Sequence, residues 1–200
     1  MAPPPDPMRI APVILTGRFV RLEPLSVAHL DGLAAVAFSP GLWRWTSTRV
    51  GDRPALEAYV AEALAGATAG TAIPFATVAL DSNRVAGSTR FANISARDGR
   101  MEIGWTWIAE PWQRTAVNTE AKLLMMTHAF ETLGAHRVEY KTHARNATSR
   151  AAIERLGATF EGIHRKHLLM PDGTMRDTAW YSILDDEWPA VKARLAARLG

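Results

Sequence analysis

The sequence predicts a single α/β domain with a mixed, mostly antiparallel sheet of about seven strands flanked by helices. Segments with strand-like alternation and segments with helical spacing follow one another in the order β α α β β β α β α β β α. The chain has 200 residues, which suffices for one substantial core, and neither a linker nor an internal repeat divides it.

Composition excludes several classes of protein. The hydrophobic fraction of 48% with 22% charged residues is typical of a globular domain, and no apolar run is long enough to cross a membrane. Cysteine is absent, which excludes disulfides and thiolate chemistry and fits a cytoplasmic location. The net charge of +3 comes from dispersed basic residues, so no nucleic-acid partner is expected.

The first residues differ in composition from the rest. Residues 1–12 are rich in proline and contain no apolar core of a signal peptide. They predict a flexible, Pro-rich arm, and residues 13–200 form the domain.

The N-terminal half predicts five elements. Alternation within 13–25 indicates a strand that Pro24 stops, and Ser26 caps the helix that follows. The segment 39–52 is loop-like. The remaining elements are a helix from Pro54 to about Ala65 and strands over 72–80 and 84–94, joined by a polar turn at 81–83.

The C-terminal half predicts the rest. Its elements are a strand over 101–108, a helix from near Asn118 to Gly134, a strand over 137–142, a helix from Asn146 to Gly157, a hairpin of 159–169 with 175–184, and a helix from Asp185 or Asp186 to Leu199.

The stretch from Trp105 to Lys122 carries the strongest functional signal. It reads as an apolar strand, a tight connection and the start of an amphipathic helix. The first N–H groups of a helix lack partners within it, and the helix dipole adds positive charge there. This stretch therefore predicts a site for a phosphate-bearing cofactor.

Four segments, residues 15–25, 102–108, 113–130 and 146–158, carry a resemblance to a known family. In this order and spacing the chain resembles the GNAT superfamily of acyl-CoA-dependent N-acyltransferases, and most closely its RimJ/RimL-type branch of ribosomal-protein-alanine acetyltransferases. The resemblance covers about Val13 to Trp188. It implies one GNAT-like domain with a splayed parallel strand pair, and acetyl-CoA or another short acyl-CoA as co-substrate.

The resemblance also implies a pyrophosphate loop of the form Gln/Arg-x-x-Gly-x-Gly/Ala at residues 113–118. Gln113 matches this form, whereas Ala116 stands where glycine is usual and Asn118 where a small residue is usual. In the Gly-x-Gly-x-Asn form that the branch uses, Arg114 and Ala116 stand at the two glycines. Alanine can serve there if its φ is negative. The cofactor-binding residues expected from the resemblance are Trp107, Ile108, Gln113, Arg114, Thr115, Ala116, Val117, Asn118, Thr119, Asn146 and Ser149.

Acyl transfer to an amine requires removal of a proton from the nucleophile and a proton for the leaving thiolate. Glu102 is the candidate base or water-positioning residue, and alternation places it on one strand face with Gly104, Thr106 and Ile108. The alternative is a solvated glutamate at the start of a strand. Ser149 matches the family position near the sulfur, and its alternative is a helix serine that bonds backbone.

The acceptor pocket is expected around Trp43, Trp45 and His143, since the loop over 39–52 lines it in similar proteins. The two tryptophans could equally close the edge of the domain, and His143 could be structural. His164 and His167 lie three residues apart on a predicted strand, so they should face opposite sides and make a poor metal pair. No metal is expected.

Together with the resemblance, these observations predict an enzyme that transfers an acetyl or similar short acyl group from acyl-CoA directly to a primary amine. A protein N-terminus, a lysine and a small amine all remain open as acceptors. The alternative is a non-catalytic acyl-CoA-binding or sensing protein of the same fold. A homodimer is left open.

Overall fold

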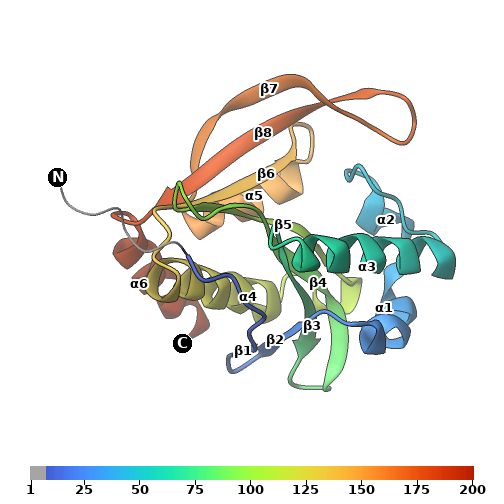
Figure 1. Ribbon diagram of the computed structural model, residues 1–200, viewed down its shortest axis with the longest axis horizontal. Coiled ribbons are helices and arrows are strands. Elements are labelled where there is room, and N and C mark those ends of the chain that lie inside the picture. The colour runs from blue at the N-terminus through green and yellow to red at the C-terminus, as the bar shows by residue number, and fades with distance from the viewer. Residues whose placement is uncertain (1–7) are drawn as a thin grey trace.

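The computed structural model describes residues 8–200 as one eight-stranded sheet with helices on both faces (Figure 1). The strand order is β1-β2-β3-β4-β5-β6-β8-β7, and only the β5–β6 pair is parallel. The predicted fold class is confirmed, and the sheet is extended by the two-residue β1. The strands are β1 Leu15–Thr16, β2 Val20–Pro24, β3 Ile73–Ala79, β4 Arg84–Ser95, β5 Arg100–Ile108, β6 Arg137–His143, β7 Thr159–Leu169 and β8 Met175–Leu184.

The helices occupy the predicted places with shifted ends. They are η1 Val27–His29, α1 Leu30–Ala37, α2 Pro40–Trp43, α3 Arg53–Thr68, η2 Glu110–Trp112, α4 Ala116–Thr127, the π-turn η3 His128–Thr132, α5 Ala147–Leu156 and α6 Trp188–Leu199. The short α2 falls in the segment that was predicted to be a loop.

Side-chain hydrogen bonds explain where several helices begin. Asp52 caps α3 by accepting from the N–H of Ala55 at 2.9 Å. The helix α4 begins before the predicted Asn118 because the hydroxyl of Thr115 accepts from the N–H of Val117 at 3.3 Å.

Helices cover the two faces of the sheet unequally, and each face has its own core. The helices α1 and α3 pack on one side, which we call the α3 face, over a cluster that includes Leu33, Leu56 and Trp107. The helices α4, α5 and α6 pack on the other side, the α4 face, over a larger cluster that includes Phe91 and Met125. The hairpin of β7 and β8 extends the sheet beyond β6 (Figure 1).

The loop between β1 and β2 is fixed directly to α4. The buried carboxylate of Glu120 accepts hydrogen bonds from the backbone N–H groups of Arg18, Phe19 and Val20 at 2.8, 2.6 and 2.9 Å. A Cβ at Gly17 would overlap this carboxylate. The segment 15–25, one of those that carry the family resemblance, therefore holds in place the helix that follows the expected pyrophosphate loop.

The predicted Pro-rich arm lies mostly outside the described residues, since the description begins at Met8. Met8 itself is only 8% exposed, and Ile10 packs against the larger core. Within residues 8–200, no helix combines the length and apolar character needed to cross a bilayer.

Candidate active site

The sheet opens between its two parallel strands. The strands β5 and β6 pair only at their beginnings, over Arg100↔Arg137, Met101↔Val138 and Glu102↔Glu139. Beyond these pairs, β5 continues to Ile108 and β6 continues to His143, but the two strands no longer pair with each other. They therefore diverge. This is the splayed parallel pair that the resemblance implies.

A bulge interrupts β5 beside this opening. Arg90 of β4 pairs with Gly104, whereas Ser88 pairs with Trp107, so β5 contains one extra residue between these positions. Trp105 takes up the extra length with a φ of 49°, in the left-handed region that favours glycine.

The bulge reverses the alternation of side chains along β5. Glu102 and Gly104 face the α3 face, whereas Thr106 and Ile108 face the α4 face. The hydroxyl of Thr106 there accepts a hydrogen bond from Lys122 of α4 at 2.7 Å. The prediction that Glu102 shares a face with Thr106 and Ile108 was therefore wrong, because it assumed an unbroken strand.

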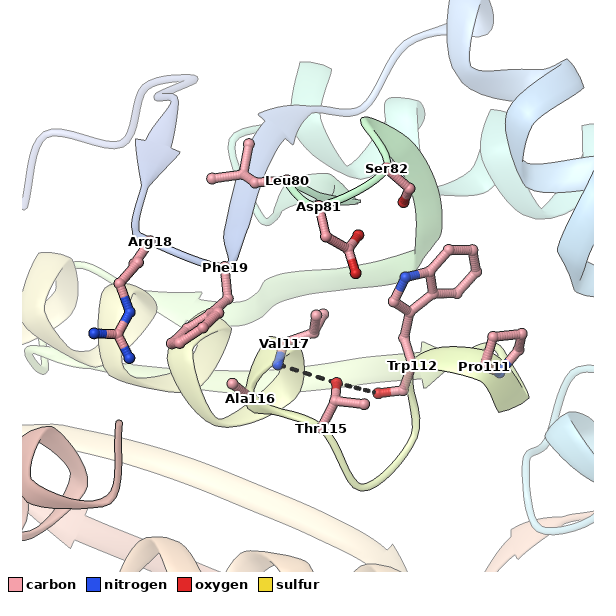
Figure 2. Close-up of a pocket in the computed structure, with 10 residues that line it drawn as sticks. All are labelled: Arg18, Phe19, Leu80, Asp81, Ser82, Pro111, Trp112, Thr115, Ala116 and Val117. Carbon is pink, nitrogen blue, oxygen red and sulfur yellow. Dashed lines mark hydrogen bonds between the residues drawn. The ribbon is translucent and has the colours of Figure 1, made fainter. Parts of the chain in front are cut away.

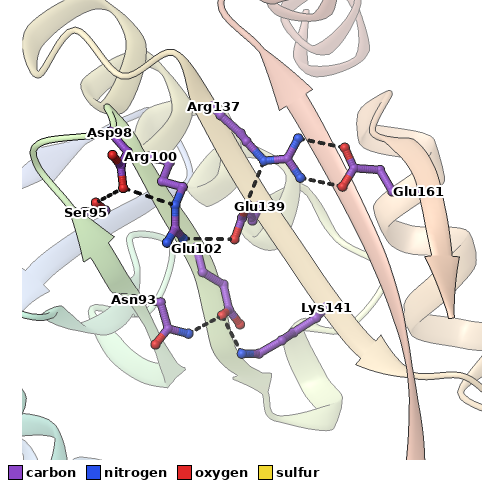
Figure 3. Close-up of polar contacts among 9 residues, drawn as sticks. All are labelled: Asn93, Ser95, Asp98, Arg100, Glu102, Arg137, Glu139, Lys141 and Glu161. Carbon is purple, nitrogen blue, oxygen red and sulfur yellow. Dashed lines mark hydrogen bonds and ion pairs between the residues drawn. The ribbon is translucent and has the colours of Figure 1, made fainter. Parts of the chain in front are cut away.

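Glu102 is buried at the point where the strands diverge, with 2% of its surface exposed, which excludes the solvated alternative. Its Oε2 lies 2.8 Å from Lys141 Nζ and accepts a hydrogen bond from Asn93 at 2.6 Å (Figure 3). Its Oε1 accepts no hydrogen bond within residues 8–200, and a Cβ at Gly104 would lie only 2.5 Å from it. Burial raises the pKa of Glu102, and Lys141 opposes this shift.

The neighbouring carboxylate, Glu139, has different partners. It accepts from Arg137 at 2.8 Å and lies 3.8 Å from Arg100, and Arg137 also bonds Glu161 of β7 (Figure 3). These arginines satisfy Glu139, so the ammonium of Lys141 pairs with Glu102 alone.

The expected pyrophosphate loop leads into a capped helix. The side chain of Gln113 turns back to donate to the carbonyl of Ile108 at 2.8 Å. Arg114 has a φ of 61°, whereas Ala116 opens α4 and is not among the positive-φ residues. Replacement of glycine therefore causes no backbone strain at Ala116, and the left-handed conformation falls on Arg114.

Two helices begin at the open end of the parallel pair. The chain passes from β5 to α4 and from β6 to α5, and the ends of parallel strands lie at the same edge. The first turn of α4 contains Ala116–Thr119, where Asn118 Oδ1 is buried without a partner in residues 8–200. At the start of α5, Asn146 Oδ1 accepts from the N–H of Ser149 at 3.1 Å. The arrangement fits an extended anionic ligand that crosses this edge.

A pocket of about 480 Å³ adjoins the start of α4 on its other side, toward β2 and the β3–β4 turn (Figure 2). Arg18, Phe19, Asp81 and Trp112 line it together with Thr115–Val117. It is separate from the opening between β5 and β6.

The expected acceptor residues separate into two groups. Trp43 is in the core of the α3 face, where its indole N–H donates to the carbonyl of Ala37 at 2.7 Å and its ring packs 5.4 Å from Trp107. Trp45 instead contacts His143, with ring centroids 4.9 Å apart. His143 is buried, and its Nδ1 accepts from the N–H of Arg145. Burial, and then the nearby arginines, lower the pKa of His143.

His164 and His167 lie on one side of β7, and the prediction that they face opposite sides was wrong. Their ring centroids are 5.5 Å apart, and both rings contact Trp180. The register shifts between His164 and Leu168, where Lys166 has a φ of 49°. No cluster of three metal-ligating side chains occurs in residues 8–200.

Sequence reasoning missed the partners of Glu102. Lys141 is two residues from Glu139 on β6, so alternation gave a signal for its face once β5 and β6 are paired. Asn93, the other partner of Glu102, gave no comparable signal in the sequence. Neither did Lys122 on the opposite face, whose contacts depend on the bulge and on the packing of α4.

Comparison with known proteins agrees with this geometry. The Acetyltransferase (GNAT) domain matches residues 20–159. The chain belongs to the GNAT acetyltransferases. This family uses acetyl-CoA as its acetyl donor. The chain is 28% identical over 104 residues to an uncharacterized N-acetyltransferase of Bacillus subtilis, YoaA, a match that spans 52% of the chain and 58% of that relative.

Solved GNAT structures share the whole fold. A GCN5-related N-acetyltransferase from Brucella melitensis is 35% identical with a TM-score of 0.90, over 97% of this chain and 89% of that one. RimJ of Mycobacterium smegmatis, solved in complex with CoA-disulfide, is 21% identical with a TM-score of 0.77, over 96% and 93%. At that identity the likeness shows the fold alone.

Proposed function

We propose that this GNAT protein transfers an acetyl group from acetyl-CoA directly to a primary amine, in the opening between β5 and β6. The observation that carries the proposal is the open Oε1 of Glu102. This oxygen belongs to a carboxylate held by Lys141 and Asn93 through its other oxygen, and it stands over Gly104 where the strands diverge. A carboxylate fixed in this way has one oxygen positioned and one available to an incoming proton.

The residues at the two helix N-termini fit the phosphates of CoA. The first-turn N–H groups of Ala116, Asn118 and Thr119 would hold the pyrophosphate, with Thr115 capping the helix through Val117 beside them. The exposed Arg114 adds a positive charge where a glycine offers only backbone. Asn146 and Ser149 face the same edge from α5. Trp107 and Ile108 belong to this proposal as the end of β5, which the pantetheine arm would follow.

Acetyl-CoA supplies a thioester, so the C–N bond forms as the C–S bond breaks. Glu102 Oε1 accepts the proton that the amine nitrogen loses, directly or through one water. The hydroxyl of Ser149, which has no hydrogen bond within residues 8–200, gives a proton to the departing sulfur and regains one from solvent. Because burial raises the pKa of Glu102, activity should fall as the pH drops through that raised value.

A thiol-release assay with acetyl-CoA and a panel of amines tests this function. We expect turnover with at least one amine, and Glu102→Gln should lower kcat about 10²- to 10⁴-fold with little effect on KM. Glu139→Gln is the matched control, because Glu139 is a buried carboxylate at the paired position of β6 that contacts arginines instead. It should affect stability and leave kcat within about twofold.

Binding of acetyl-CoA without turnover of any amine would overturn the enzyme proposal in favour of an acyl-CoA sensor. A melting temperature that neither CoA nor acetyl-CoA raises would overturn both. The cytoplasmic location and the lack of nucleic-acid partners remain predictions, and a homodimer remains open.

A further inference from the structure

Arg176 is a buried arginine of β8 without a carboxylate partner. Only 7% of its surface is exposed, and its one side-chain hydrogen bond within residues 8–200 runs from Nε to the hydroxyl of Thr178 at 3.1 Å. Arg137, by contrast, bonds two carboxylates. A buried guanidinium without a counter-ion is costly, and a ligand that carries an anion would relieve that cost.

The terminal nitrogens of Arg176 are also accessible. Arg90 has nitrogens that are sealed from solvent without a partner, because its guanidinium lies between the rings of Tyr59 and Trp105 at 5.0 and 4.9 Å. The terminal nitrogens of Arg176 form no hydrogen bond in the described part of the chain and are not sealed in this way. They can therefore receive a ligand without a rearrangement of the core.

Strand pairing places Arg176 on the α3 face together with Glu102. Along β8, Thr178 pairs with His143 and Trp180 pairs with Lys141. Alternate residues of a strand share a face, so Arg176 lies on the same side of the sheet as Thr178 and Trp180. The carboxylate of Glu102 raises the pKa of Arg176, against the larger lowering by burial. The charge of Arg176 in turn lowers the pKa of His143.

His143, which the charge of Arg176 reaches, lies among further cations. Arg44 and Arg145 lie over the ring of Trp45 at 4.9 and 5.9 Å, and neither forms an ion pair within residues 8–200. Burial, and then the neighbouring arginines, lower the pKa of His143, which lies against the same ring.

Two carboxylates, those of Asp172 and Asp177, lie near His143, and they offset the positive charge of the arginines there only in part. Asp172 lies 3.9 Å from Arg49, and Asp177 accepts from the backbone N–H of Lys166. Both raise the pKa of His143, but less than burial and the arginines lower it. An anionic group on the ligand complements the remaining positive charge.

We propose that Arg176 binds a carboxylate of the acceptor, so that the preferred substrates are primary amines that carry a carboxylate a few bonds from the nitrogen. This inference rests on the function proposed above and narrows its acceptor. The amine would face Glu102 Oε1 while the guanidinium of Arg176 holds the carboxylate. A free amino acid and a peptide whose N-terminal residues are acidic both present this chemistry.

The test measures acetylation of paired acceptors by the full chain. Glycine, β-alanine and γ-aminobutyrate are each compared with their carboxamides, and a peptide with Asp in second position is compared with its Asn counterpart. The wild type should favour the carboxylate member of at least one pair by about 10- to 100-fold in kcat/KM, through KM. The pair with the largest ratio of kcat/KM, carboxylate over amide, shows whether a free amino acid or a peptide is preferred. It also shows the preferred spacing between the amine and the carboxylate.

Arg176→Met should reduce that ratio to near one, and Arg176→Lys should leave an intermediate ratio. Arg165→Met is the matched control, since Arg165 is exposed on β7 and its loss removes one charge from the same hairpin. It should leave the ratio unchanged. A folded Arg176→Met protein that keeps the preference, or a wild type that turns over amines without it, would overturn this inference and leave the proposed function intact.

A measurement on the wild type alone guards against variants that fail to fold. N-acetylglycine and N-acetylglycinamide represent the product with and without its carboxylate, and the corresponding products of the other pairs extend the series. At least one carboxylate product should raise the melting temperature more than its amide. Equal shifts across the whole series would contradict the inference.

Discussion

Two lysines lie on opposite faces of the sheet beside the bulge of β5, and the protein holds them in different ways. On the α3 face, Lys141 pairs with the buried carboxylate of Glu102 at 2.8 Å. On the α4 face, Lys122 is 4% exposed and donates to the hydroxyls of Thr89 and Thr106 at 2.9 and 2.7 Å. Burial without a carboxylate lowers the pKa of Lys122 to about 7.

The difference separates the side proposed to be reactive from a supporting side. Lys141 orients the carboxylate of Glu102 where β5 and β6 diverge and opposes the rise in its pKa that burial causes. Lys122 links the hydroxyls of Thr89 on β4 and Thr106 on β5 next to the bulge. Within residues 8–200 its amine bonds only neutral groups, and no carboxylate faces it. Breaking each interaction should therefore change different properties of the protein.

Lys141→Met should have the largest effect on stability. It leaves Glu102 buried without its cation, which typically costs about 3–5 kcal/mol in the free energy of unfolding near neutral pH. The pKa of Glu102 should rise further above its unfolded value, so the loss should shrink as the pH falls below the raised pKa of Glu102 and the carboxyl becomes protonated in both folded proteins. Urea unfolding at several pH values measures this.

The control for Lys141→Met is Lys192→Met. Lys192 pairs with Glu131 at the surface, with side chains 43% and 42% exposed, and such pairs contribute about 0–1 kcal/mol. Similar losses in the two variants would show that the Glu102–Lys141 pair is no more important than a surface pair.

Lys122→Met should change the pH dependence of stability. The folded pKa of about 7 lies below the ordinary 10.5, so between these values the unfolded chain binds more protons than the folded protein. Wild-type stability should gain from this group about 1.4 kcal/mol per pH unit as the pH rises through that range. The variant should lack this slope and be the more stable protein at pH 7, since Thr89 and Thr106 still bond each other at 2.7 Å. Parallel stability curves would contradict this.

Gly104→Ala should have the smallest effect and should act on the reactive side. Its Cβ would lie 2.5 Å from Glu102 Oε1, so the carboxylate must shift. We expect a loss of about 1 kcal/mol in stability and a fall in kcat of about tenfold. Gly51→Ala is the control, because a Cβ there meets no atom within 4 Å. Unchanged kcat in Gly104→Ala would show that the position of Oε1 does not matter.

Local signals predicted much of the fold. The helix α5 begins after Asn146 and ends before Gly157, which has a φ of 100°, because capping and left-handed backbone depend on the residues at those positions. The hairpin of β7 and β8 likewise has its predicted ends, around a Pro-Asp-Gly turn.

Pairing between distant strands limited the prediction of the site. Glu102 was identified from its place on β5, but the side it faces relative to Thr106 depends on the bulge at Trp105, which appears only in the register with β4. The two histidines of β7 were misplaced for the same reason, since Lys166 interrupts the register with β8. Alternation is reliable only where a strand is unbroken.

A crystal structure with acetyl-CoA or CoA bound tests the central claim most directly, because two places adjoin the start of α4. We predict that the pantetheine arm lies between β5 and β6, with the sulfur near Gly104 and Ser149 and the pyrophosphate at Ala116–Thr119. A CoA molecule whose arm occupies the pocket of Arg18, Asp81 and Trp112 on the other side of α4, away from Glu102, would contradict the account.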